Sequence, residues 1–181
     1  MLVLAEPDVR FERAYKDMMA EWSRAGETPL PWVLQEDATD FAALVDKLKR
    51  IAEGVGVPEG FAPSSSYFVY DDETGVLAGA VNIRHWLAER MGYWGHIGYG
   101  VRPSLRRRGY ATMMLAMALE RCTAMGMARA MAACYKDNTA SAKTILKNGG
   151  VLERELPDPH TGRTIQQYWF DTPKGAGHEI R

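Results

Sequence analysis

The chain has 181 residues, of which 46% are hydrophobic and 25% are charged, and its formal net charge at pH 7 is −1. A chain of this length fits one domain with a substantial core, whereas two full domains would need a longer chain. The near-neutral balance argues against a protein that binds long nucleic acids through a uniformly basic surface.

The sequence also lacks the usual marks of export, membrane insertion and metal binding. It contains no uninterrupted apolar run of 18 residues, and the apolar run at 2–5 is too short for a secretory signal. We therefore expect a cytoplasmic protein with no membrane partner. Cys122 and Cys134 lack the paired spacing of metal ligands, which predicts buried, reduced thiols and no metal.

Hydrophobic periodicity divides the first third of the chain into a strand and two helices. In chain order it predicts a strand at 2–5, a helix at 7–25, a break at 26–31, a helix at 39–52, and a loop rich in Gly, Pro and Ser at 54–66.

From residue 67 the apolar period changes from helical to extended. The pattern predicts a hairpin of strands at 67–70 and 76–86, a strand at 94–101, a helix at 108–124, a strand at 128–135, a helix at 138–148, and strands at 151–156 and 163–170. Because a helix connects the strands at 94–101 and 128–135, these two strands should run parallel.

The segment between the strand at 94–101 and the following helix has the composition of an anion site. It reads Arg102-Pro-Ser-Leu-Arg-Arg-Arg-Gly-Tyr-Ala-Thr112. A helix start offers unpaired backbone N–H groups and the positive end of the peptide dipoles, and Gly109 keeps the backbone open to a ligand. The two best-known glycine-rich nucleotide motifs do not occur in the chain. A surface turn whose arginines only solvate a helix start is the competing interpretation.

The pattern Arg106-x-x-Gly109-x-Ala111 resembles the acetyl-CoA pyrophosphate loop of the GNAT superfamily of N-acetyltransferases. A second stretch, Asn138-Thr-Ala-Ser141, resembles the other nucleotide-contacting motif of that family, with Asn138 as a helix N-cap. The element order fits as well. The residues around His85, His96 and Tyr99 resemble a bacterial subgroup of predicted acetyltransferases in this superfamily.

The resemblance implies an α/β (α+β) GNAT fold, with a mixed, mostly antiparallel sheet of about seven strands, a splayed parallel pair and about four flanking helices. Residues 1–171 would form the single domain and 172–181 a loose C-terminal tail. It also implies acetyl-CoA as co-substrate, held between the splayed strands. The implied contacts are Tyr99, Gly100, Val101, Arg106, Arg107, Arg108, Gly109, Tyr110, Ala111, Thr112, Asn138 and Ser141.

Many members of the family carry a tyrosine seven positions after the motif's asparagine, where it protonates the departing CoA thiolate. This chain has Ile145 at that position. A thiol with a pKa of about 8.5 is already a tolerable leaving group near neutral pH. Tyr135 is the alternative proton donor, and a packed strand aromatic is the competing interpretation of that residue.

The acceptor side is less defined by the sequence. Since an alkyl ammonium is protonated at pH 7, a base would assist its attack, and His96 is the candidate, with a structural or substrate-contact role as the alternative. His85, Glu27 and Trp32 are candidate substrate contacts, although a solvated Glu27 is the competing interpretation.

Taken together, these features predict an enzyme that acetylates a primary amine by direct attack in a ternary complex. The acceptor would be a small amine, an amino acid, or a peptide or protein amino group, with no nucleic acid as partner. A non-catalytic acyl-CoA-binding regulatory or sensor module is the alternative, because the usual tyrosine is missing. A homodimer is an assembly that the sequence leaves open.

Overall fold

The computed structural model describes residues 1–172, and residues 173–181 lie outside the described part. Seven strands form one sheet in the order β1-β2-β3-β4-β5-β7-β6. The strands are β1 (Leu2–Ala5), β2 (Ser64–Asp71), β3 (Val76–Arg84), β4 (Ile97–Val101), β5 (Arg129–Tyr135), β6 (Val151–Pro157) and β7 (Thr164–Asp171). The α-helices are α1 (Glu12–Arg24), α2 (Phe41–Ala52), α3 (Tyr110–Ala124) and α4 (Thr139–Lys147).

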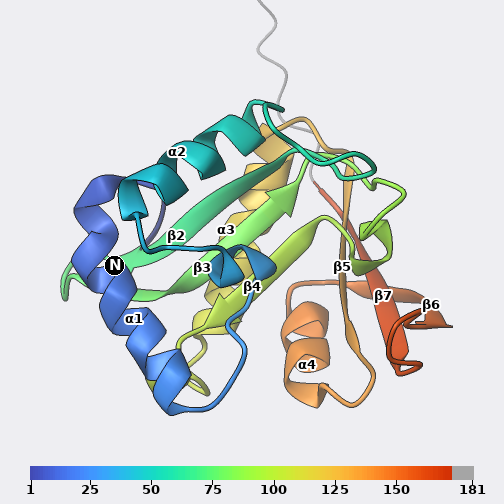
Figure 1. Ribbon diagram of the computed structural model, residues 1–181. Coiled ribbons are helices and arrows are strands. Elements are labelled where there is room, and N and C mark those ends of the chain that lie inside the picture. The colour runs from blue at the N-terminus through green and yellow to red at the C-terminus, as the bar shows by residue number, and fades with distance from the viewer. Residues whose placement is uncertain (173–181) are drawn as a thin grey trace, which may run out of the picture.

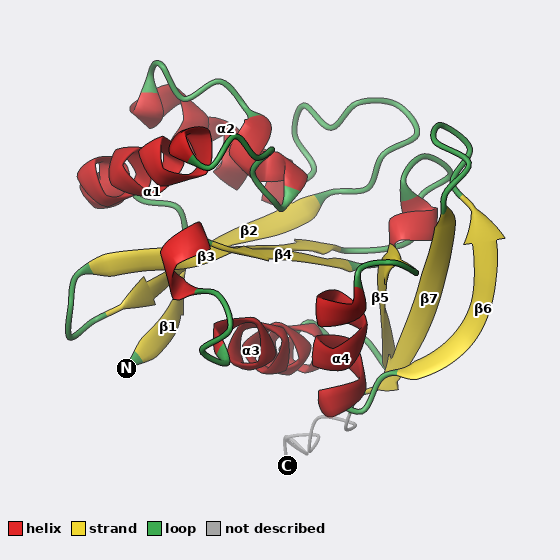
Figure 2. Cartoon of the chain, turned by 90° about the horizontal axis from the view of Figure 1, so that it is seen from below, coloured by secondary structure: helices red, strands yellow, loops and turns green. Residues whose placement is uncertain are grey.

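The helices cover both faces of the sheet, as Figures 1 and 2 show. Helices α1 and α2 lie on one face, where Tyr15, Met18 and Leu44 pack against Phe68 of β2. Helix α3 lies on the opposite face, where its buried Met114 belongs to a second apolar cluster. The predicted mixed sheet with four helices is therefore confirmed.

All neighbouring strands are antiparallel except β4 and β5, which are parallel. Their pairing contains a single register pair, Ile97 with Ala132. Beyond Ile97 the two strands separate, and Figure 1 shows α4 near the opening between them. The predicted splay between these strands is confirmed.

The start of β2 was predicted wrongly. Residues 64–66, all serine, were expected to belong to a loop, but they are the first three residues of β2. Ser64 and Ser66 are buried, and each hydroxyl accepts a hydrogen bond from the Asn82 side-chain amide at 3.1 Å. Three serines suggest a loop by composition. The hydrogen bonds to Asn82 on β3 explain why they can lie in a buried strand.

The other boundaries agree with the predicted elements to within a few residues. Three short 3-10 helices were not predicted, at Trp32–Gln35, Gly92–Trp94 and Pro103–Leu105. Thr172, grouped in the sequence analysis with a loose tail, is buried, and its backbone N–H donates to the carbonyl of Ala128 at 3.1 Å. The remainder of that tail, 173–181, lies outside the described residues.

Candidate active site

The opening between β4 and β5 exposes backbone groups that a sheet would normally pair. Even-numbered residues of this segment bond to β3, as the Arg102 N–H to Ala78 carbonyl bond of 2.9 Å shows. Backbone groups alternate sides along a strand, so those of Tyr99 and Val101 point toward β5, which has already turned away. The Tyr99 N–H and C=O and the Val101 N–H are thus available to an amide-bearing ligand.

The start of α3 presents the unpaired backbone donors that an anion site requires. Among residues 1–172 no acceptor is present for the six consecutive backbone N–H groups of 107–112, and the first backbone bond of the helix is Met113 N–H to the Gly109 carbonyl. Arg107 and Gly109 have φ of 61° and 84°, which turns this backbone outward. Gly109 is exposed, and a Cβ added there would meet no atom within 4 Å. A diphosphate would therefore meet unpaired donors, a helix dipole and two exposed arginines, Arg107 and Arg108.

Two of the four arginines of the basic cluster are already neutralised. Arg102 is buried and pairs with Asp17 (2.9 Å) and Glu21 (2.6 Å) of α1. Arg106 forms a fork of two hydrogen bonds with Glu27, at 2.9 and 2.6 Å.

Arg106 was predicted as a CoA contact, and the structure gives its side chain other partners. Its guanidinium also lies 4.8 Å from the Trp22 ring, and its Nε donates to the Val101 carbonyl at 3.2 Å. It anchors the segment after α1 to the cradle. The same fork accounts for Glu27, whose pKa is lowered by the hydrogen bonds from Arg106, so Glu27 is not a free partner for a substrate.

The start of α4 faces the same opening. Asn138 is the N-cap, since its Oδ1 accepts the Ser141 N–H at 3.1 Å, as predicted. The Ser141 hydroxyl lies 2.9 Å from the Tyr99 hydroxyl, which connects α4 to β4 across the opening. Burial raises the pKa of Tyr99 to about 12, so this phenol keeps its proton at neutral pH.

Ile145 and the two cysteines belong to the core. Ile145, which replaces the family's usual tyrosine, is completely buried. Cys122 and Cys134 are both free thiols and buried, and burial raises the pKa of each. Neither thiol has the lowered pKa of a cysteine nucleophile.

His96 has a structural environment that does not suit the predicted base. It is 8% exposed, and its Nδ1 accepts the Met131 backbone N–H at 3.0 Å. This bond places the ring proton of the neutral imidazole on Nε2, which then has no free lone pair. Burial, with a contribution from the charge of Arg84, lowers the pKa of His96 to about 4. The imidazole supplies an acceptor for β5 at the point where β4 and β5 begin to separate.

Tyr135 lies on the sheet face that carries α1 and α2, because Cys134 next to it faces the α3 cluster. Its hydroxyl donates to Asp158 at 2.5 Å, and its ring packs against Trp94 and the guanidinium of Arg163. Burial and this hydrogen bond raise the pKa of Tyr135, while the bond lowers the pKa of Asp158 to about 2. The phenolic proton is committed to Asp158, so Tyr135 is a poor candidate for proton delivery to a thiolate.

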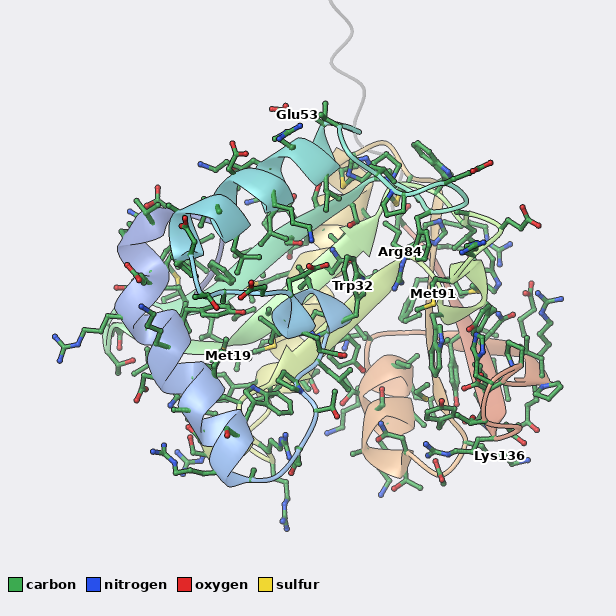
Figure 3. The ribbon with its side chains drawn as sticks, viewed as in Figure 1. Met19, Trp32, Glu53, Arg84, Met91 and Lys136 are labelled. Atoms are coloured by element: carbon green, nitrogen blue, oxygen red, sulfur yellow. The ribbon has the colours of Figure 1, made fainter. Side chains whose placement is uncertain are left out.

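His85 and Trp32 lie on opposite sides of the sheet. The His85 Nε2 lies 2.9 Å from the hydroxyl of Ser65, whose side chain faces away from Ser64, Ser66 and Asn82. Burial lowers the pKa of His85. Figure 3, viewed from the side of α1 and α2, shows Trp32 in front of β4 and Arg84 near the end of β3. Trp32 lies on the face of the sheet that carries α1 and α2. Among the three predicted substrate contacts, it is the one on this face whose side chain has no polar partner among residues 1–172.

Two features of the site were not predicted from the sequence. A Cβ at Gly100 would lie 1.9 Å from the Leu30 carbonyl oxygen, and one at Gly98 would lie 3.2 Å from Pro31. These two glycines therefore let the 26–31 segment lie directly on β4. In the sequence, glycines on both sides of Tyr99 could have indicated a strand face that another segment approaches closely. The second feature is Arg84, a buried arginine on β3, which no local pattern distinguishes.

Within residues 1–172 no three His, Cys, Asp or Glu side chains are grouped to hold a metal ion. None of the helices in this range has the length and apolar character needed to cross a membrane.

Comparison with known proteins agrees with this geometry. A profile of the acetyltransferase (GNAT) domain matches residues 4–151. Comparison with curated protein sequences gives no match. Among solved structures, the ribosomal L7/L12 α-N-protein acetyltransferase RimL bound to coenzyme A is 18% identical, with a TM-score of 0.71 and coverage of 96% of this chain and 95% of that one.

Two further structures show the same fold. The microcin C7 self-immunity acetyltransferase MccE, bound to acetyl-CoA and AMP, is 18% identical with a TM-score of 0.66, and 94% and 92% of the two chains are covered. Spermidine N-acetyltransferase from Vibrio cholerae, bound to CoA and spermine, is 15% identical with a TM-score of 0.65, and 96% of each chain is covered. Since the profile spans most of the sequence, the chain belongs to the GNAT family of acetyltransferases, enzymes that use acetyl-CoA as co-substrate.

Proposed function

We propose that this protein transfers an acetyl group from acetyl-CoA to a primary amine by direct attack in a ternary complex. The observation that carries the proposal is the pairing of two ligand-ready backbone regions, the unpaired N–H groups of 107–112 and the unpaired β4 groups at Tyr99 and Val101. The first region suits the CoA diphosphate and the second suits the pantetheine amides.

In this proposal the amine nitrogen attacks the thioester carbonyl carbon, which becomes tetrahedral. The free backbone N–H of Tyr99 or of Val101 stabilises the negative charge that develops on the carbonyl oxygen. The carbon–sulfur bond then breaks, and CoA leaves as a thiolate. The amide product retains the new carbon–nitrogen bond.

The proton for the departing thiolate comes from the Ser141 hydroxyl, which Tyr99 can resupply across their 2.9 Å contact. This replaces the missing tyrosine at Ile145. Because the thiolate is a fair leaving group without help, Ser141→Ala should lower turnover by no more than about 10²-fold, the lower end of general acid–base effects. Binding of CoA should be nearly unchanged.

The acceptor loses its proton to water before attack, since His96 is committed to Met131. Activity should then rise with pH along the titration of the acceptor amine. Acceptors whose amine pKa values differ should give pH profiles displaced by the same amount.

The test is release of CoA thiol and appearance of the acetylated product with a broad panel of amines. Turnover with any amine supports the proposal. Tight CoA binding without turnover across the panel would contradict it and favour the acyl-CoA sensor that the sequence left open. Gly109→Glu, which places a carboxylate in the cradle, is the matched inactive control.

A further inference from the structure

Arg84 is a buried cation without an anionic partner. Arg84 is 8% exposed, and among residues 1–172 the one hydrogen bond of its side chain runs from NH1 to the Gly95 carbonyl at 2.8 Å. No carboxylate of residues 1–172 lies within salt-bridge distance of it, whereas the equally buried Arg102 has two. A guanidinium carries five N–H donors, so most of its hydrogen-bonding capacity is unused.

The unused donors of Arg84 keep contact with solvent. The fully enclosed polar side-chain atoms without a partner among residues 1–172 are Tyr15 Oη, Trp22 Nε1 and Asn82 Oδ1, and no nitrogen of Arg84 is among them. The guanidinium is therefore not fully sealed from solvent. Burial alone lowers the pKa of Arg84, which is the expected response of a cation that lacks a counter-charge.

Arg84 is placed next to the point where β4 and β5 separate, three residues before Tyr99 in the register of β4. Its backbone N–H donates to the His96 carbonyl at 2.8 Å, one residue before the last β4–β5 pair at Ile97. Its side chain shares a face with Asn82, which lies opposite Gly98 of β4. This is the face of α1, α2 and Trp32, opposite to α3 and α4 (Figure 3). A residue diagonal to Gly98 is within about 7–8 Å across the strand pair, a distance that an arginine side chain spans.

Two carboxylates near this face already have partners. Glu27 is held by Arg106, and Asp158 accepts a hydrogen bond from the Tyr135 hydroxyl. Arg84, in contrast, has no carboxylate partner among residues 1–172, so its positive charge is unbalanced locally.

We propose that Arg84 binds a carboxylate of the acceptor, so that the acceptor is a primary amine that also carries a carboxylate. This inference rests on the proposed acetyl transfer. The guanidinium and the carboxylate form charge-assisted, two-pronged hydrogen bonds, which fix the amine relative to the thioester. A polyamine such as spermidine would instead bring positive charge toward a buried cation.

Both a free α-amino acid and a peptide with an acidic first residue offer this chemistry. The peptide α-amine has a pKa of about 7.7–8.0, well below the value of about 10.4 for an alkyl amine. A substantial fraction of it is therefore neutral near pH 7.5, which agrees with a site that provides no base of its own.

The test compares matched acceptors that differ only in charge. Alanine is paired with alaninamide, and the peptide amide Asp-Ala-NH₂ with Asn-Ala-NH₂, while spermidine serves as the polycation. Rates are expressed per concentration of neutral amine. We expect kcat/KM to favour the carboxylate member of at least one pair by about 10- to 100-fold, the effect of hydrogen bonds to a charged group. The pair that shows it identifies the source of the carboxylate.

Arg84→Gln should reduce this preference to about one, because glutamine can still donate to the Gly95 carbonyl but has no charge. Arg50→Gln, an exposed arginine of α2, removes the same charge elsewhere and should keep the wild-type preference. The preference is a ratio within one protein sample, so partial unfolding of a variant does not change it. Equal rates for both members of each pair, a preference for spermidine, or an unchanged preference in Arg84→Gln would overturn the inference.

A binding measurement separates this inference from the proposed reaction. N-acetylalanine and N-acetylalaninamide are titrated into the complex with CoA by calorimetry. A preference for the carboxylate that disappears in Arg84→Gln supports the site even if no amine is acetylated. Equal or absent binding of both, in a protein that turns over amines, leaves the reaction standing and refutes the role of Arg84.

Discussion

The environment of His96 predicts a stability effect that depends on pH. The pKa of His96 is about 4 in the folded protein and about 6.5 in the unfolded chain, so the unfolded chain binds the proton more tightly. The stabilisation is present above pH 6.5 and is lost as pH falls toward 4. The full difference would be worth about 3 kcal/mol, and partial screening by water reduces the expected loss to about 2 kcal/mol.

Three variants separate packing from base catalysis. His96→Ala removes the acceptor for the buried Met131 N–H and should lower the free energy of unfolding by about 2–4 kcal/mol at pH 7.5. His96→Asn can keep an acceptor near the position of Nδ1 but cannot titrate, so it should lose less stability and show a smaller decline between pH 7.5 and 5. His160→Ala changes an exposed histidine and serves as the control.

Urea unfolding at both pH values, followed by circular dichroism, measures these differences. If wild type and His96→Asn lose the same free energy between pH 7.5 and 5, the lowered pKa is refuted. Turnover of folded His96→Asn should stay within about tenfold of wild type, well above the loss of a general base. A loss of 10²-fold or more in this folded variant would instead restore His96 as the base.

Three further predictions concern the start of α3, the thiol of Cys134 and the contact between Glu27 and Arg106. Gly109→Glu should abolish CoA binding in calorimetry while Gly109→Ala, which tests the strain at φ 84° alone, should retain measurable affinity; equal loss in both would remove charge from the explanation. Cys134→Ala should retain most of its activity, with intersecting initial-rate plots, because its thiol is buried and its pKa raised; parallel plots and a dead variant would indicate an acetyl-cysteine intermediate. Glu27→Gln should weaken the anchor on Arg106 and raise the KM for acceptors more than the KM for acetyl-CoA, and a selective loss of acetyl-CoA affinity would contradict this assignment.

The sequence predicts those parts of the site in which the interacting residues are close together in the chain. The cradle depends on a strand, a short turn and a helix start that are contiguous in the chain, so its backbone donors follow from the order of residues. The same holds for Asn138, whose capping partner is three residues away. The parallel pairing of β4 and β5 follows from the helix between them.

The use of individual charges could not be predicted in this way. Arg106 and Arg108 look alike in the sequence, but the partner of Arg106 is Glu27, 79 positions earlier. His96 has the residue type of a base, and only the approach of Met131, 35 positions later, shows that its lone pair is used. Side-chain function here depends on contacts between distant segments, which a periodic pattern does not specify.

The segment from Gly95 to Val101 divides its backbone groups between the protein and the ligand. On the side of the vertex where β4 and β5 meet, side chains complete the pairing: Arg84 donates to the Gly95 carbonyl, and His96 accepts from Met131. Beyond the vertex, Arg106 donates to the Val101 carbonyl, but among residues 1–172 no side chain pairs with the Tyr99 N–H and C=O or with the Val101 N–H. These three groups are satisfied only by water or a ligand. A histidine that closes the vertex therefore fixes where the opening begins. This accounts for a buried, neutral His96 at the vertex without any proton transfer to it.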